Sequence, residues 1–410
     1  MKILKPVLII VLLLAAGLTA FNLISGSKDY PPAAPRGDVT LSDFYIPPAE
    51  LPSTPGVLVR QGQLNPASHL ANAAENIAIL YSSTEGLNGE TINTVSGALY
   101  LPAGTPPAGG WPLLIWSHGT VGIGDRCAPS YAGRSERDRT YLNPWLEAGY
   151  AIAASDYQGL GMPGTHPYMD AQTMAYNNLD LIRALQSADF PVSKQAVIAG
   201  QSQGASGAIA TAGFRAAYAS EIDLRGIMAT GIPYLSRKVI LDLIRNSDRD
   251  AVNASLALSL YMLTLTEMID PKFSLDRVVS DAARPIVDDI GETCVFDFIG
   301  KTQEAGLSSR TTFTRRTEFA LLKAFERMRY PVTDYDIPVF TGSGTDDQIT
   351  PFSMQQAFIE DACNAKATLV INTYDGANHN QGLLQSGDSA KAFARAVMAG
   401  DTVASTCPAP

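Results

Sequence analysis

The sequence predicts an α/β fold in which a mostly parallel, doubly wound sheet carries an inserted helical cap. The first observation is that short apolar runs and helical patterns alternate from residue 112 onward. Such runs are typical of buried parallel strands, and their alternation with helices is typical of βαβ units. The second observation is that residues 234–333 have much helical and little strand character. With 410 residues, 46% of them hydrophobic, the chain can bury a large core.

The N-terminus has the pattern of an export signal. Lys2 and Lys5 precede an apolar run from Pro6 to Ala20, as in the charged and apolar regions of a signal peptide. The run continues to Ile24, close to the roughly 20 residues that span a bilayer, so an uncleaved membrane anchor is the alternative. We expect a secreted or periplasmic protein, with membrane anchoring as the second interpretation.

The composition after the signal predicts an arm and then the folded part. Residues 26 to about 60 are rich in Pro, Ser and Gly, which is typical of an extended segment. The expected organisation is a signal or anchor at 1–25, an extended arm at 26–60, the first part of an α/β core at 61–233, a helical cap or lid at 234–333 and the second part of the core at 334–410.

Each strand of the expected sheet is a short apolar run. An antiparallel start precedes a parallel series, and the insertion falls between the fourth and fifth strands of that parallel series. The expected strands are 77–81 and 95–101, then 112–117, 150–155, 196–199, 226–229, 339–342 and 368–374, with helices at 171–187, from 205 onward and after each of the last two strands.

Charge and cysteine content exclude several classes of protein. The formal net charge is −10 and no basic stretch tracks a phosphate backbone, so nucleic acid is not an expected partner. The four cysteines form no CxxC pair, which argues against a zinc or redox motif, and no metal or cofactor is expected. An even count behind an export signal favours two disulfides. Three connectivities are open, and Cys363 with Cys407 is the economical pair.

The segment Gly200-Gln201-Ser202-Gln203-Gly204 is the candidate nucleophile turn. The predicted strand 196–199 precedes it, and a predicted helix begins at Ala205. This context is that of the nucleophile elbow of the α/β-hydrolase fold, in which a sharp turn lifts the serine hydroxyl above the sheet. A Gly/Ser turn without chemistry is the alternative. Since a serine hydroxyl needs a base, a histidine is required nearby.

Chain order selects the partners of Ser202. In this fold the acid and the histidine follow the serine, and His379 is the one histidine of the four that comes after it. The acid should follow the predicted strand 339–342, where the spacing of Gly344 and Pro351 favours Asp347 over Asp346. The acid would orient and stabilise the imidazole. The structural alternative is that an aspartate here caps the next helix through an Asx turn.

Two backbone N–H groups are expected to form an oxyanion hole. One is the N–H of Gln203, directly after the nucleophile. The other comes from the loop after strand 112–117, where His118-Gly119-Thr120 offers Gly119 and Thr120, and Thr120 is favoured. We expect His118 to have a structural role in that loop.

Several further segments together resemble a known family. They are 43–48 (DFYIPP), 118–120 (HGT) followed by 127–130 (CAPS), and 155–161 (SDYQGLG) followed by 166–168 (HPY). These segments are similar to those of the secretory lipase family, the lipase A type of yeasts with its bacterial relatives. The likeness covers roughly residues 40–400 and is weakest in the expected cap.

The resemblance implies a serine hydrolase that cleaves carboxylic esters, including acylglycerols, with a helical lid and a Ser202–Asp347–His379 triad. It implies disulfides from Cys127 to Cys294 and from Cys363 to Cys407, a small-molecule or lipid ester as substrate and contact with a lipid interface. Yeast members have Gly after the nucleophile, whereas this chain has Gln203, whose larger side chain we expect to narrow the acyl pocket. The rivals are a peptidase or amidase on the same fold and a surface binding module without activity.

Overall fold

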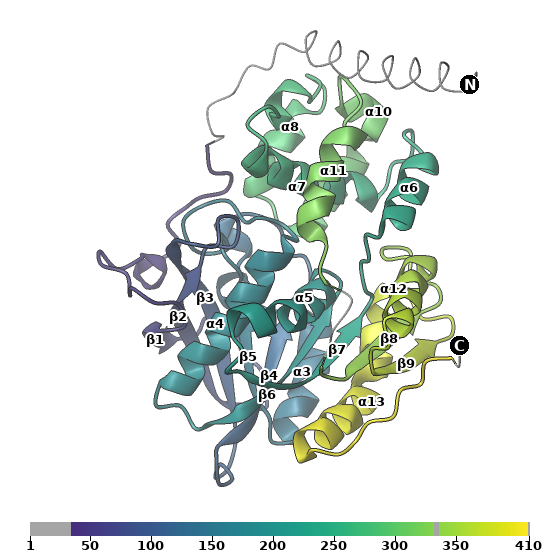
Figure 1. Ribbon diagram of the computed structural model, residues 1–410. Coiled ribbons are helices and arrows are strands. Elements are labelled where there is room, and N and C mark those ends of the chain that lie inside the picture. The colour runs from purple at the N-terminus through teal and green to yellow at the C-terminus, as the bar shows by residue number, and fades with distance from the viewer. Residues whose placement is uncertain (1–33, 332–335, 409–410) are drawn as a thin grey trace, which may run out of the picture.

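The computed structural model describes residues 34–331 and 336–408 (Figure 1). The predicted signal or anchor at 1–25 lies outside the described residues. The described residues form one nine-stranded sheet in the order β1-β2-β3-β5-β4-β6-β7-β8-β9. The strands are β1 (Leu58–Gln63), β2 (Ala73–Thr84), β3 (Ile92–Pro102), β4 (Trp111–Ser117), β5 (Ala151–Ser155), β6 (Val192–Gln201), β7 (Asp223–Thr230), β8 (Val339–Gly344) and β9 (Leu369–Tyr374).

The sheet is antiparallel at one side and parallel over the rest, which confirms the predicted fold class. Strands β1, β2, β3 and β5 pair antiparallel in that order, and the series β5, β4, β6, β7, β8 and β9 is parallel. Strand β1 was not expected, and its first three residues fall within the predicted extended arm. Every residue of this edge strand is half-buried or exposed. Its sequence, LVRQGQ, therefore lacks the long apolar run by which the other strands were predicted.

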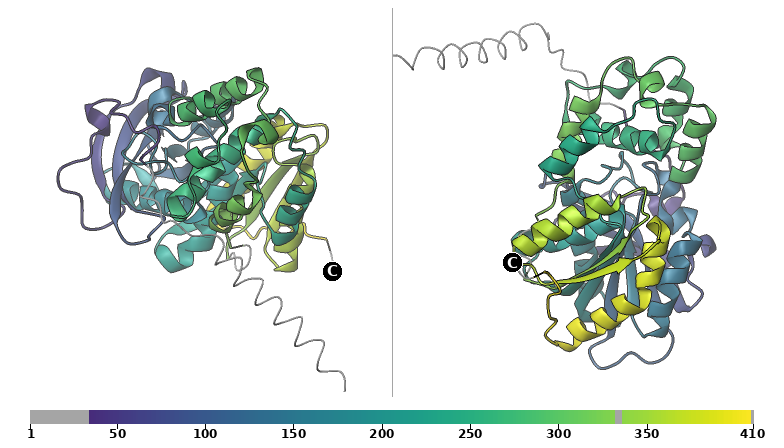
Figure 2. Two further views of the ribbon diagram at one scale, coloured as in Figure 1. Left: turned by 90° about the horizontal axis from the view of Figure 1, so that it is seen from above. Right: turned by 90° about the vertical axis from the view of Figure 1, so that its right-hand side faces the viewer.

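Helices cover both faces of the sheet (Figures 1 and 2). One face packs against α4 (Ala171–Ser187), α5 (Gln203–Tyr218) and α12 (Phe352–Asn364). The other face packs against α3 (Glu136–Glu147) and α13 (His379–Ala399). Asp170 and Asn378 cap the first turns of α4 and α13 through their side chains, which satisfies backbone N–H groups that a helix start leaves unpaired.

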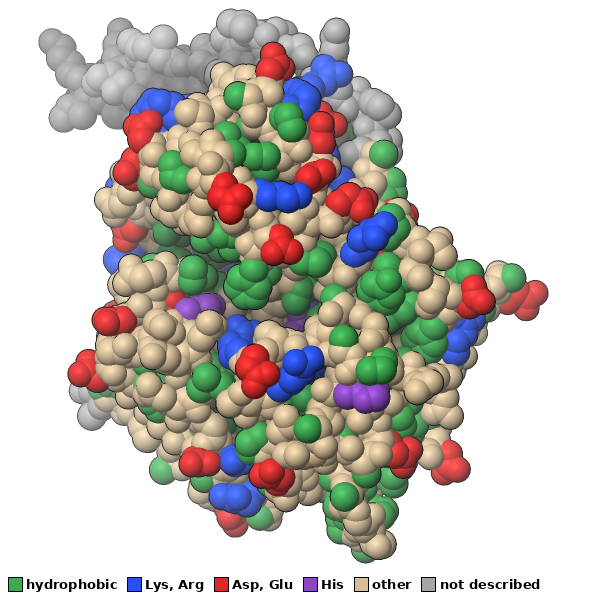
Figure 3. All heavy atoms as spheres, turned by 180° about the vertical axis from the view of Figure 1, so that it is seen from behind, with side chains coloured by type: hydrophobic (Ala, Val, Ile, Leu, Met, Phe, Trp, Pro, Cys, Tyr) green, Lys and Arg blue, Asp and Glu red, His purple; other side chains and the backbone are tan. Residues whose placement is uncertain are grey.

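Helices occupy the described residues between β7 and β8. They are α6 (Arg237–Arg245), α7 (Ala254–Ile269), α8 (Arg284–Val287), α9 (Val295–Glu304), α10 (Ser309–Thr312) and α11 (Glu318–Met328). Together we call them the helical segment. The segment has its own hydrophobic cluster, which also contains Ile123 and Tyr168 from loops that follow β4 and β5. The segment therefore lies over the carboxyl ends of the parallel strands, and hydrophobic side chains gather along a hollow beneath it (Figure 3).

A disulfide and ion pairs are among the contacts that hold the helical segment to the rest of the fold. A disulfide joins Cys127 to Cys294. Arg327 of α11 donates to the fully buried carboxylate of Asp170, with Nε 2.6 Å from Oδ2. Arg36, in the region of the expected arm, pairs with Glu267 of α7 at 3.0 Å. These cross-links tie the segment to the loops around the carboxyl edge of the sheet.

The second disulfide lies at the far end of the sheet. It joins Cys407 to Cys363 of α12, so both pairings implied by the resemblance are present. The chain before Cys407 runs beside β9, where the Thr406 N–H donates to the Leu369 carbonyl at 2.7 Å and the Ile371 N–H donates to Thr406 Oγ1 at 2.8 Å. Across residues 34–331 and 336–408, no helix has the length and apolar character needed to cross a bilayer.

Candidate active site

Ser202 sits at a sharp turn between β6 and α5. Its backbone angles are φ 60° and ψ −125°, a region that costs a non-glycine residue free energy and that persists only where the surroundings enforce it. The flanking glycines allow the turn, because a Cβ on Gly200 would lie 2.0 Å from the Gly204 carbonyl oxygen and a Cβ on Gly204 would lie 1.8 Å from the Ser117 carbonyl oxygen. The structure thus has the elbow geometry expected from the motif.

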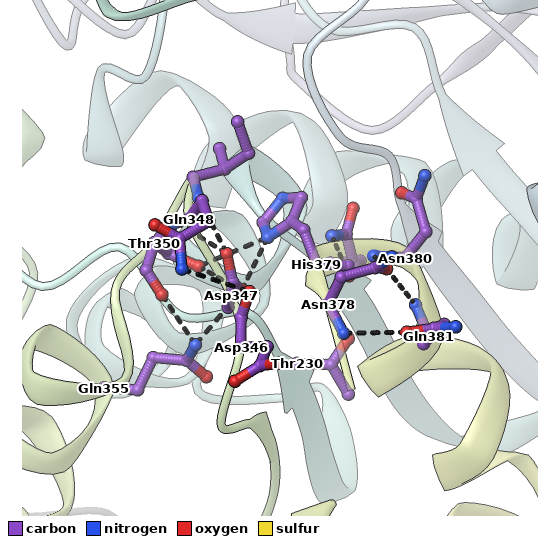
Figure 4. Close-up of polar contacts among 12 residues, drawn as sticks. Thr230, Asp346, Asp347, Gln348, Thr350, Gln355, Asn378, His379, Asn380 and Gln381 are labelled. Carbon is purple, nitrogen blue, oxygen red and sulfur yellow. Dashed lines mark hydrogen bonds and ion pairs between the residues drawn. The ribbon is translucent and has the colours of Figure 1, made fainter. Parts of the chain in front are cut away.

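Asp347 and His379 come together at the ends of β8 and β9 (Figure 4). Oδ2 of Asp347 lies 2.7 Å from Nδ1 of His379. The carboxylate is almost fully buried, whereas the imidazole keeps 15% of its surface exposed. Because the carboxylate can only accept at this contact, it holds the proton on Nδ1 and leaves Nε2 free.

The Asp347 carboxylate has further donors. Oδ1 accepts the N–H groups of Ile349 and Thr350, both at 2.9 Å. Oδ2 accepts the Thr350 hydroxyl at 2.8 Å and the Gln355 amide at 3.1 Å. Burial raises the pKa of Asp347, but the bonds from His379 and Thr350 outweigh it and hold the pKa below its usual value. The same aspartate therefore makes the Asx-type turn and faces the histidine.

Asp346, the alternative acid, points elsewhere. Its side chain is exposed, and its backbone N–H donates to the Ala377 carbonyl at 3.0 Å. The geometry brings only Asp347 of the two candidates into contact with His379 (Figure 4).

The imidazole of His379 lies next to the nucleophile turn. A Cβ on Gly231 would be 2.9 Å from His379 Cε1, and the residue before Gly231, Thr230, accepts the backbone N–H of Ser202 at 3.0 Å. Ser202 is half-buried. Among the described residues, no hydrogen bond joins Ser202 Oγ to His379. Such bonds are often long in the absence of substrate and tighten in the complex.

The two predicted oxyanion residues lie on neighbouring elements. Gln203 is the first residue of α5, where its N–H has no carbonyl of the same helix to meet. Thr120 follows β4, the strand next to β6 in the sheet. His118 is buried, with its ring nitrogens near the carbonyls of Gly119 at 2.7 Å and Asp156 at 3.1 Å. It thus supports the loop, as expected. Within the described ranges, no group of three or more His, Cys, Asp or Glu side chains is arranged to hold a metal ion.

The family profile described as secretory lipase matches residues 132–390, more than half of the chain and including all three residues of the candidate triad. The chain belongs to the secretory lipase family. No curated protein matches its sequence significantly.

The fold of this secretory lipase is similar to solved structures of lipases and esterases. Candida antarctica lipase A in its closed state is 17% identical with a TM-score of 0.72, and the match covers 90% of this chain and 89% of that one. The rice cell wall degrading esterase LipA from Xanthomonas oryzae is 20% identical with a TM-score of 0.65, over 85% and 98%. A putative hydrolase from Legionella pneumophila is 16% identical with a TM-score of 0.64, over 84% and 98%. These likenesses show the α/β-hydrolase fold.

Sequence reasoning missed the glutamine before the nucleophile in this secretory lipase. Gln201 is fully buried, and its Nε2 donates to the backbone carbonyl of His379 at 3.1 Å. Arg137 of α3 donates to Gln201 Oε1 at 2.8 Å and also contacts Asn380 at 3.3 Å. These contacts connect the serine turn to the histidine loop. A polar glutamine directly before the nucleophile was the available signal, but its partner lies 178 residues away.

Sequence reasoning also missed the partner of the glutamine that follows the nucleophile. The Gln203 side chain is buried and its amide lies 3.0 Å from Nε2 of His166. We expected this side chain to narrow an acyl pocket. Its amide contacts a buried histidine, and the narrowing of the acyl pocket stays a prediction.

Proposed function

We propose that this chain is a secreted carboxylic ester hydrolase that cleaves lipid-type esters, including acylglycerols, through a Ser202–Asp347–His379 triad. The observation that carries the proposal is the strained Ser202 elbow beside the buried Asp347–His379 pair. Family membership supports an ester as substrate. No metal or organic cofactor is required for this chemistry.

The reaction follows from which nitrogen of His379 is free. Asp347 holds the proton on Nδ1, so Nε2 takes the proton of Ser202 as its hydroxyl attacks the ester carbonyl. The N–H groups of Gln203 and Thr120 bind the oxyanion of the tetrahedral intermediate. The alcohol leaves with a proton from His379, and water then attacks the acyl-enzyme with His379 again as base.

Apolar surface around the helical segment supports a lipid-like substrate, with the segment acting as a cap. On α6, Leu241 and Leu243 are 42% and 40% exposed. Arg237, Lys238 and Arg245 place basic groups at the two ends of the same helix. A helix that combines exposed leucines with cations suits contact with a lipid interface. We propose that α6 makes that contact.

Two disulfides support export of the protein. Disulfides form and persist in oxidising compartments such as the periplasm or the extracellular space, and all four cysteines are paired. We propose a secreted or periplasmic location, with the N-terminal segment acting as signal or anchor.

The deciding experiment measures covalent labelling and turnover together. Wild type should form a fluorophosphonate adduct at Ser202 and hydrolyse nitrophenyl esters from acetate to palmitate, and Ser202→Ala should lose both. Ser206→Ala is the matched control, since Ser206 is buried on the same helix and has no assigned role. Full hydrolysis by Ser202→Ala would overturn the triad. Faster cleavage of a matched amide than of the ester would favour the peptidase alternative.

A further inference from the structure

The segment His166-Pro167-Tyr168 contacts both residues proposed for the oxyanion hole, although it supplies neither of the two N–H donors. The Gln203 amide lies 3.0 Å from Nε2 of His166. The Tyr168 hydroxyl lies 2.8 Å from Oγ1 of Thr120. His166 and Tyr168 are both buried. One short loop therefore touches the side chains on both sides of the hole.

The hydrogen-bond pattern around His166 defines its tautomer. Nδ1 lies 2.8 Å from the Gln158 carbonyl, which can only accept, so Nδ1 carries the proton. Nε2 is then unprotonated and accepts a hydrogen from the Gln203 side-chain amide. Burial lowers the pKa of His166 to about 3, with a smaller contribution from His118, so the ring stays neutral at ordinary pH. Both of its nitrogens are occupied by fixed partners.

The Tyr168 side chain is held in a similar way. Burial raises the pKa of Tyr168 to about 12, so the phenol keeps its proton and can donate to or accept from Thr120. Its ring packs against Tyr261 of α7, with centroids 5.5 Å apart. The ring orientation is therefore set by the helical segment as well as by the loop.

Backbone hydrogen bonds and ring packing hold the His166–Tyr168 loop in place. The Tyr168 N–H donates to the His166 carbonyl at 2.9 Å, and the Asp170 N–H donates to the Pro167 carbonyl at 2.9 Å. The His166 ring lies nearly parallel to that of Tyr157, with centroids 6.0 Å apart. The Tyr157 hydroxyl bonds to Ser117 Oγ at 2.6 Å, at the end of the strand that leads to Thr120.

We propose that His166 and Tyr168 are positioning residues for the oxyanion hole. His166 fixes Gln203, and Tyr168 fixes Thr120, so the two backbone N–H groups converge before substrate arrives. Preorganised donors stabilise the transition state more than the bound ester. The inference rests on the proposed function, because it assumes that Gln203 and Thr120 bind an oxyanion.

The test uses His166→Phe, which keeps a flat ring but removes the acceptor, and Tyr168→Phe, which removes one hydroxyl. Each should lower kcat about tenfold with KM within about twofold, since a loosened hole weakens only transition-state binding. The affinity for a trifluoromethyl ketone, which forms a tetrahedral adduct with serine, should weaken by the same factor as kcat. A purely structural role would not make these two quantities change in parallel.

A double-mutant cycle checks that His166 acts through Gln203. Gln203→Met removes the side-chain amide and keeps the backbone N–H. In that background, His166→Phe should have little further effect, whereas two independent contributions would multiply. His69→Phe serves as the control, since His69 bonds to the Leu64 carbonyl and has no part in the site.

The outcomes distinguish the proposed ester hydrolysis from the positioning roles of His166 and Tyr168. If wild type hydrolyses esters and Ser202→Ala does not, the proposed function stands. Unchanged kcat and ketone affinity in folded His166→Phe and Tyr168→Phe would then overturn the positioning roles alone. If His166→Phe fails to fold, Tyr168→Phe and Gln203→Met still decide the question. An inactive wild type would overturn both proposals.

Discussion

The carboxylate of Asp347 lies 2.7 Å from Nδ1 of His379, while Asp346, one residue earlier, is exposed to solvent. The turn after β8 causes this difference, because the Ile349 and Thr350 N–H groups bind the Asp347 side chain and direct it inward.

Exchanging each aspartate for asparagine should separate the two positions. Asp347→Asn keeps the shape of the side chain but presents an amide donor or a neutral acceptor to His379. We expect kcat to fall by roughly 10³–10⁴-fold, as when a triad acid is lost. Asp346→Asn is the matched control and should stay within about twofold of wild type. The reverse result in steady-state ester hydrolysis would assign the acid to Asp346.

Gln201 should affect activity through the position of His379. Gln201→Leu removes the bond to the His379 carbonyl and the acceptor for Arg137. Even a small displacement of a catalytic group lowers the rate strongly. We therefore expect kcat to fall about 10–100-fold while the protein stays folded. The exposed Gln348, changed to Leu, is the control. Wild-type kcat in Gln201→Leu would mean that the histidine loop does not depend on this contact.

The Arg327–Asp170 pair should be important for stability because Asp170 is fully buried. Arg327→Met leaves an uncompensated buried carboxylate, which typically costs about 3–5 kcal/mol in the free energy of unfolding. Adding Asp170→Asn should restore much of that loss, since the amide needs no cation. Chemical denaturation measures both effects. Arg310→Met, which breaks an exposed pair with Asp250, should leave the free energy of unfolding almost unchanged.

Asp125 should make stability depend on pH. Burial, together with nearby Asp38, raises the pKa of Asp125 to about 7 although the Val39 N–H opposes this. The folded protein thus binds the proton more tightly than the unfolded chain, whose aspartate has a pKa of about 4. Its contribution to stability is fully present below about pH 4 and is lost as the pH rises through about 7.

Asp125→Asn removes this dependence. Its Tm should exceed that of wild type by roughly 2–4 °C at pH 8, the shift produced by about 1 kcal/mol in a large domain. Near pH 4 the two Tm values should approach each other. A Tm difference that is the same at both pH values would show that Asp125 does not titrate as described.

Helix α6 should contribute more to hydrolytic activity at a lipid surface than to activity on dissolved esters. Leu241→Ser with Leu243→Ser removes exposed apolar area that would otherwise enter the lipid boundary. We expect at least about a fivefold loss of activity on emulsified triacylglycerol, with hydrolysis of a soluble short-chain ester unchanged. Leu51→Ser, which changes a leucine 40% exposed elsewhere, is the control. Equal losses on both substrates would contradict a role at the interface.

Local patterns predicted the parts of the molecule whose signals lie close together in the sequence. The apolar runs predicted the parallel strands, and the strand–turn–helix context placed Ser202 at an elbow. Strand β1 was not predicted because an edge strand with polar residues lacks such a run. The partners of Gln201 and Gln203 were not predicted for another reason. His379 and His166 reach them through tertiary packing across 178 and 37 residues, and no spacing rule encodes such contacts.

The short chain segment before Cys407 also determines how the sheet meets its surroundings. Strand β9 pairs with β8 on one side, and a bare strand on the other side would offer N–H and C=O groups to a strand of another molecule. Residues 405–407 occupy those groups at Leu369 and Ile371, and the bond to Cys363 keeps them in place. The second disulfide therefore holds a chain segment against the outer edge of β9, where the paired groups of Leu369 and Ile371 are no longer open to a strand of another molecule.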